Sequence, residues 1–138
     1  MSGNWKVFEK DSVQGQITYG EGIFKYCNDD FVNNDAAYDN SGDLKPIPFF
    51  GTMVGYTHRW NDALRSTASF GYVNLDNEGS QGPNAYNQTY YASANVIWQM
   101  RKRLTLGLEC LYGYKEEQSG QVGDVWRVQL GAKYSLFD

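Results

Sequence analysis

Spaced basic side chains are the residues of this sequence best suited to do chemistry. They recur at alternate positions in stretches that otherwise alternate apolar with small or polar residues. The charges of this polar register, seven basic and one acidic, are Lys6, Arg59, Arg65, Arg103, Glu109, Lys115, Arg127 and Lys133. Most other positions of the register hold Thr, Ser, Gln, Asn or Gly, and a wet, electropositive surface favours small anions. We therefore expect these residues to line an aqueous, anion-preferring pore.

The positions of the cations predict how an anion would pass. Arg59, Arg65 and Lys133 lie within one to three residues of the short turns, whereas Arg127 lies near a long loop. An anion would meet positive charge on entry and again on exit, and conduction needs such weak, multi-site binding. The alternative is structural, because the same arginines could brace the wall by pairing with loop carboxylates.

Other reactive side chains do not combine into a site. His58 is the only histidine and falls in the apolar register near a turn, so we interpret it as an interfacial residue. Without a second histidine or a plausible cysteine partner, a transition-metal site is not expected. Cys27 and Cys110 are expected to be free thiols. With no nucleophile and base pair, the sequence predicts neither an enzyme nor a cofactor.

The element that shows how these residues are positioned is the stretch from 126 to 136. Its apolar residues occupy every second position: Trp126, Val128, Leu130, Ala132, Tyr134 and Leu136. Side chains of a strand point to opposite faces with period two, so this is a strand with one apolar and one wet face. A strand of about this length can cross a bilayer when tilted.

The same alternation predicts about seven strands in a single domain. They cover residues 4–7, 12–22, 50–60, 64–74, 86–98, 104–114 and 126–136. Short and long connections alternate between them, and the longest loop covers about 23–48. Outer-membrane barrels join their strands by short periplasmic turns and longer external loops. We therefore expect an all-β, antiparallel up-and-down transmembrane β-barrel.

The apolar register has the features of a surface that faces lipid. At its even positions, the last five predicted strands carry no Asp, Glu, Lys or Arg. Its aromatics form two bands, as in interfacial girdles. The band near the short turns is Trp60, Trp98 and Tyr134, and the band near the long loops is Phe50, Tyr72, Tyr86, Tyr112, Tyr114 and Trp126. The alternative is a soluble β-barrel or sandwich that binds a small ligand and buries this face in a core.

Composition and strand number limit the biological setting. The net charge of −4 and the sequence pI of about 4.9 argue against nucleic-acid binding. The segment 1–6 lacks the features of a signal peptide, so an exported form would be a mature chain or a piece of a longer precursor. Single-chain bacterial barrels have an even number of strands and at least eight. The chain is thus expected to be the C-terminal segment of a larger barrel, or to join copies of itself edge to edge.

Several stretches resemble, in order, the C-terminal portion of the DcaP-like outer-membrane porins. They are 20–23, 26–29, 51–60, 64–66, 71–73, 91–98, 107–113, 127–129 and 134–135. The resemblance covers nearly the whole chain and implies a bacterial outer-membrane location. It also implies a trimeric channel that passes small, often dicarboxylic, anions. The expected partners are therefore the lipid bilayer, these anions and further copies of the chain. One departure is the end of the chain, where Asp138 follows Phe137 in place of the usual terminal aromatic residue.

Overall fold

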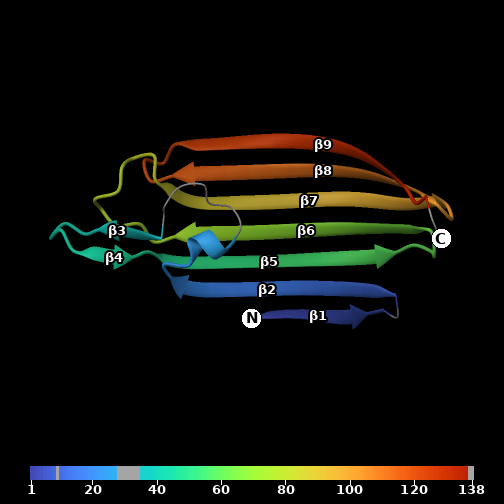
Figure 1. Cartoon of the computed structure of the whole chain (residues 1–138), viewed down its shortest axis with the longest axis horizontal. Helices are drawn as coiled ribbons and strands as arrows, with labels where there is room; N and C mark the ends of the chain where they lie inside the picture. Colours follow the sequence, from blue (N-terminus) through green and yellow to red (C-terminus); the bar gives the residue numbers. More distant parts are fainter. Residues whose placement is uncertain (9, 28–34, 137–138) are drawn as a thin grey trace.

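The fold is an open antiparallel β-sheet of seven strands (Figure 1), seen in a computed structural model that describes residues 1–8, 10–27 and 35–136. Its strands, in spatial order, are β1 (Ser2–Val7), β2 (Asp11–Glu21), β5 (Pro48–Arg59), β6 (Leu64–Leu75), β7 (Tyr86–Arg101), β8 (Leu104–Glu117) and β9 (Val122–Tyr134). All neighbours are antiparallel, so the prediction of an all-β, up-and-down meander is confirmed. In the described part of the chain β1 and β9 form the two edges.

The connections divide the sheet into a turn end and a loop end. Short turns join β1 to β2, β5 to β6 and β7 to β8 at the right of Figure 1, and the connections β2–β5, β6–β7 and β8–β9 lie at the left. The expected alternation of short and long connections holds as far as β8, but the last connection, which was expected to be long, covers only 118–121. The connection between β2 and β5 has structure of its own, with the short 3-10 helix η1 (Phe24–Cys27) and a hairpin of β3 (Ala36–Tyr38) and β4 (Leu44–Pro46). No helix of the described residues has the length and hydropathy of a membrane span.

The last strand lies closer to the loop end than expected. The backbone N–H of Glu117 donates to the carbonyl of Gln121 at 2.9 Å, which closes a tight connection. Because of this closure, pairing starts at Glu116 with Val122, and β9 ends at Tyr134. Leu136 therefore lies beyond the strand, and the predicted departure at Phe137 and Asp138 falls outside the described residues.

The register gives the sheet two chemically distinct faces. Val13 pairs with Tyr56, Tyr56 with Ala68 and Ala68 with Ala94. The side of the sheet that carries these residues continues over the even positions of β8 and β9, and we call it the apolar face. The opposite side carries Ser12 and Thr57 and is the polar face. The division follows from the period of two in a strand.

Two bulges in β7 interrupt this parity. One extra residue lies between Tyr86 and Gln88, and another between Gln99 and Arg101. An extra residue opposite a single partner shifts the alternation by one. Tyr86, which pairs with Glu117, thereby comes onto the polar face, and Arg101, which pairs with Leu104, comes onto the apolar face.

A small buried core fastens the β2–β5 connection to the sheet. Phe24, Ile47, Phe49 and Leu75 are nearly inaccessible, and Tyr86 packs against them. The ring of Phe24 lies 5.7 Å from that of Phe49 and 5.2 Å from that of Tyr86, between centroids. Since Phe49 and Leu75 belong to the polar face, the segment at η1 lies over that face at its loop end. The sequence had indicated only a polar loop here.

Candidate functional site

A continuous row of polar side chains crosses the polar face, closer to the turn end than to the loop end. Cross-strand pairing joins one residue of every long strand in this row: Lys6, Ser12, Thr57, Thr67, Asn95, Glu109 and Gln129. The hydroxyls of Thr57 and Thr67 hydrogen-bond at 3.0 Å, and Asn95 Nδ2 donates to Glu109 Oε2 at 3.4 Å. The sheet can thus present a hydrated band without a break from one edge to the other.

Two arginines lie next to this row on the side of the turns. Arg59 and Arg65 are direct cross-strand partners at the ends of β5 and β6, and both are exposed. Within the described residues neither guanidinium forms an ion pair. Bracing by a described carboxylate therefore does not apply to this pair, and both side chains are exposed.

Arg127 lies deeper along the sheet than expected. It pairs with Leu111, in the same row as Ser93 and Ser69, whose hydroxyls hydrogen-bond at 2.7 Å. Its predicted place near the loops was based on a strand starting at Trp126, whereas β9 starts at Val122. Its guanidinium also lacks an ion-pair partner in the described part of the chain.

The remaining predicted lining residues have different surroundings. Lys133 pairs with Thr105 on the polar face at the turn end. Arg103 lies in the β7–β8 turn and so belongs to the rim. Lys115 lies at the loop end, where its Nζ is 3.0 Å from Glu117 Oε1 and 5.9 Å from the centre of the Tyr86 ring. Lys115 therefore has part of the bracing role that the sequence left open.

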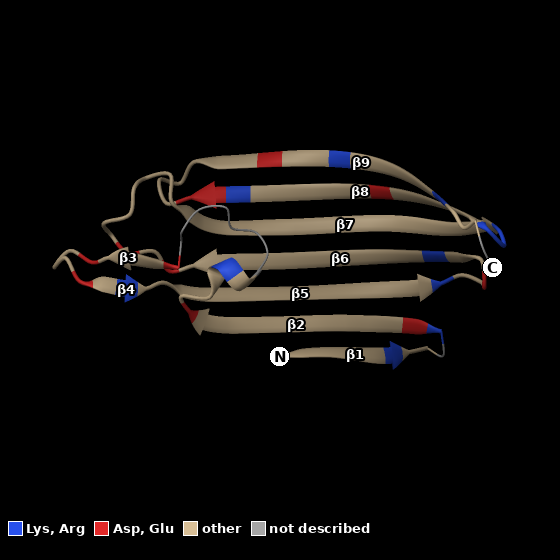
Figure 2. Cartoon of the chain, viewed as in Figure 1, with Lys and Arg blue, Asp and Glu red and all other residues tan. Residues whose placement is uncertain are grey.

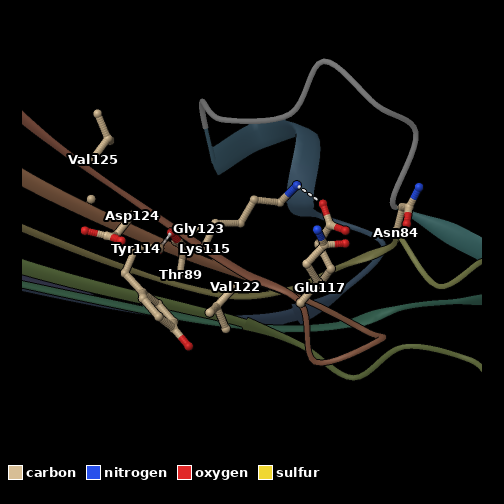
Figure 3. Close-up of a pocket in the computed structure, with 11 residues that line it drawn as sticks. Asn84, Thr89, Tyr114, Lys115, Glu117, Val122, Gly123, Asp124 and Val125 are labelled. Carbon is tan, nitrogen blue, oxygen red and sulfur yellow. Dashed lines mark hydrogen bonds and ion pairs between the residues drawn. The ribbon is translucent and has the colours of Figure 1, made fainter.

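An open pocket of about 660 Å³ surrounds the Lys115–Glu117 pair (Figure 3). The β8–β9 hairpin supplies most of its wall, and Thr89 and Asn84 complete it. Figure 3 shows the Lys115 side chain reaching toward the carboxylate, with the dashed line marking their ion pair. The lining also contains Asp124, so the pocket is polar and its acidic side chains outnumber its single basic one.

Charge is separated along the strands (Figure 2). The turn end gathers basic residues: Lys6, Lys10, Arg59, Arg65, Arg101, Lys102, Arg103 and Lys133. Carboxylates prevail at the loop end, from Asp35, Asp39, Asp43, Asp76, Glu78, Glu116, Glu117 and Asp124. The sequence had predicted positive charge at both ends of the path, but the structure concentrates it at the turns and in the middle.

One loop carboxylate is firmly held in its charged form. Asp39, between β3 and β4, lies 2.8 Å from Lys45 Nζ and accepts hydrogen bonds from the backbone N–H groups of Asp43 and Ser41. The Lys45 ammonium, followed by these N–H donors, lowers the pKa of Asp39 to about 2. The same pair raises the pKa of Lys45. The ion pair between Asp39 and Lys45 thus stabilises the β3–β4 hairpin.

The predicted interface aromatics lie on the apolar face with one exception. Phe50, Tyr72, Tyr90 and Tyr114 follow one another across four strands, with ring centroids 6.4, 5.1 and 5.4 Å apart. The others on that face are Trp60, Trp98, Tyr112, Trp126 and Tyr134. Tyr86 is the correction, because the bulge after it turns its ring to the polar face. No described segment covers the apolar face as a soluble core would require, and Leu130 is 82% exposed.

The structure adds a buried acidic residue that the sequence had placed in the turn between the predicted strands 4–7 and 12–22. Asp11 is the first residue of β2, on the apolar face, and is only 5% exposed. Its carboxylate accepts a hydrogen bond of 2.5 Å from the Tyr56 hydroxyl and one of 3.1 Å from the Arg59 N–H, and lies 2.8 Å from His58 Nδ1. His58 is interfacial, as expected, with Trp60 edge-on at 4.4 Å. Asp11 is two residues before Val13, and this spacing already indicated in the sequence that both side chains lie on the apolar face.

Comparison with known proteins agrees with this architecture. The family described as DcaP outer membrane protein matches residues 1–136. The crystal structure of the outer membrane channel DcaP of Acinetobacter baumannii superposes with a TM-score of 0.78 at 24% identity, over 95% of this chain and 38% of that one. No curated protein sequence matches significantly. The fold is thus shared with an outer-membrane channel, of which this chain spans 38% of the length.

Proposed function

The chain belongs to the DcaP outer membrane protein family and thus to the bacterial outer membrane. We propose that it forms part of the wall of a channel for small anionic solutes such as dicarboxylates. The observation that carries the proposal is the polar row through all seven strands of the sheet, flanked by arginines that form no ion pair with any described residue. In this arrangement the polar face lines water and the apolar face, with its aromatic bands, contacts lipid.

The spacing of the cations favours passage over capture. The Arg59–Arg65 pair and Arg127 lie two rows apart on the polar face, or about 13 Å at roughly 3.3 Å per residue along a strand. A permeating anion would be attracted to each in turn, with the hydroxyl and amide groups of the polar row between them. Several weak sites allow an ion to enter and leave, whereas one deep site would trap it.

A complete channel requires partners at the edges of the sheet. The backbone groups of an unpaired edge strand cannot remain unsatisfied within lipid. We propose that further strands or a second copy pair with β1 and β9. A homotrimer of such barrels is the assembly that the family resemblance favours. Nucleic acid is not a proposed partner, because the chain is acidic.

The test is ion selectivity in a planar bilayer under a salt gradient. The reversal potential of the wild type should indicate anion over cation preference, which weakens as salt rises and screens the arginines. Changing Arg65 and Arg127 to Glu should move the potential toward cations. The matched control is Lys10→Glu with Lys102→Glu, which alters net charge equally but lies in the β1–β2 and β7–β8 turns, outside the strands.

Three results would contradict the proposal. The first is a wild type that already prefers cations. The second is a reversal potential that the Arg65 and Arg127 double change leaves in place. The third is a shift of the same size in the control, which would assign selectivity to overall charge rather than to the polar face.

A further inference from the structure

The second bulge of β7 places an arginine on the face where the described strands carry no other Lys or Arg. The extra residue between Gln99 and Arg101 gives Arg101 the partner Leu104, which itself pairs with Tyr134 on the apolar face. Among the described residues of the seven-stranded sheet, Arg101 is the only Lys or Arg on that face. Without the bulge its side chain would share the polar face with Gln99.

The surroundings of Arg101 are aromatic and apolar. Trp98 and Tyr134, which are 45% and 62% exposed, belong to the turn-end aromatic band at the same level of the sheet. The side chain of Arg101 is exposed, and it forms no ion pair with any described residue. An exposed cation in an aromatic band is at the depth where lipid headgroups meet water.

Asp11, the acidic residue on the apolar face at the turn end, does not offset the charge of Arg101. Asp11 is buried, and Tyr56, His58 and the Arg59 N–H occupy its carboxylate. Asp11 lies on β2 and Arg101 on β7, with β5 and β6 between them. The exposed surface around Arg101 therefore presents net positive charge to whatever contacts it.

We propose that Arg101, with Trp98 and Tyr134 as its flanks, binds the phosphate of an anionic phospholipid headgroup in the leaflet at the turn end. A guanidinium presents a planar fork of donors that matches phosphate oxygens, and the neighbouring rings suit the junction of headgroup and acyl chain. The inference rests on the apolar face lying in lipid, which the proposed channel shares, but it is independent of which ions the channel passes.

Fluorescence quenching by brominated lipids tests this site directly. Changing Trp5, Trp60 and Trp126 to Phe leaves Trp98 as the only reporter. The protein is reconstituted in vesicles that contain chain-brominated phosphatidylglycerol or chain-brominated phosphatidylcholine. The preference for the anionic lipid should be about five-fold, the effect expected for one cation at an anionic membrane surface.

Variants at Arg101 identify the group responsible. Arg101→Gln should reduce the lipid preference to about one, and Arg101→Lys should keep part of it, because charge remains while the fork is lost. Arg65→Gln, on the polar face, is the matched control and should leave the preference unchanged. Higher salt should weaken the preference of the wild type.

The possible outcomes separate this inference from the channel proposal. Equal quenching by the two lipids in the wild type, or an undiminished preference in Arg101→Gln, overturns the lipid site alone. Absence of quenching by either lipid overturns both, since the apolar face would then not contact lipid. Anionic-lipid preference in a channel that selects cations overturns the proposed selectivity and leaves the lipid site standing.

Discussion

Arg59 and Arg65 lie directly opposite each other across β5 and β6, two like charges on one face with no ion pair among the described residues. Like charges in direct cross-strand positions destabilise a sheet. The pair is therefore a local cost to stability that a bound anion would relieve. In the channel proposed above, the same repulsion keeps both guanidinium groups directed toward water and solute.

Changing Arg65 to Glu should separate stability from selectivity. The variant creates an opposite-charge pair with Arg59, which should raise the free energy of unfolding by about 0.2–1 kcal/mol. It also removes one of the two adjacent cations, so anion selectivity should fall. Heat-modifiable migration on gels and the reversal potential measure the two effects. A variant that is less stable than Arg65→Gln would contradict the predicted cross-strand attraction.

Removing the Phe24 ring should release the segment that lies over the polar face. Phe24 is 2% exposed and packs on Phe49 and Tyr86, and Phe→Ala changes in such cores cost about 3–5 kcal/mol. Without this packing, the segment at η1 should no longer be held in one position over the polar face. Single-channel conductance should then rise or become noisier. The matched control is Phe50→Ala, whose ring faces the other side. Unchanged conductance in Phe24→Ala would show that the segment does not narrow the path.

Asp11→Asn should weaken the turn end of β2 and β5. The amide cannot accept all the hydrogen bonds that the carboxylate accepts from Tyr56 and the Arg59 N–H, and a buried group left unsatisfied costs about 1–3 kcal/mol. The midpoint of chemical unfolding should fall accordingly. Asp62→Asn, in an exposed turn, serves as the control and should change little. Equal effects of the two changes would argue against a special role for the buried carboxylate.

The β3–β4 hairpin should respond to acid in a narrow range. The pKa of Asp39 is lowered from 3.8 to about 2, so its pairing with Lys45 stabilises the hairpin above pH 3.8 and is lost as the pH falls through about 2. Titration of the Asp39 carboxyl followed by NMR should report this low pKa. In Lys45→Met the pKa should rise toward the ordinary value. An unchanged pKa in that variant would assign the shift to the backbone donors alone.

The sequence was sufficient for the meander and for most of its faces. The alternation of apolar and polar residues over 126–136, and at the even positions of the other strands, depends only on the two-residue period of a strand. The pairing register of β5, β6, β8 and β9 follows that period without interruption. Most connection lengths were visible from Gly, Asn and Asp clusters, with the tight β8–β9 connection as the exception. These features are local, which is why they were predictable.

Three features depend on contacts that the pattern does not contain. The bulges of β7 add residues opposite β8, and they invert the faces of Tyr86 and Arg101 without changing the alternation of the sequence itself. Phe24 lies in a stretch rich in polar residues, and its burial requires Phe49 and Leu75, which are distant in the sequence. Asp11 was likewise assigned to a turn because its partners lie on β5.

The sequential order of the sheet has a consequence for the rate at which it forms. Short turns close the hairpins β5–β6 and β7–β8, and hairpins of this kind form in about 1–10 μs. The pairing of β2 with β5 must instead close the connection over 22–47, at an entropic cost that grows only slowly with length. The five strands from β5 to β9 are therefore suited to nucleate as one unit, with low contact order, before β1 and β2 add to their edge.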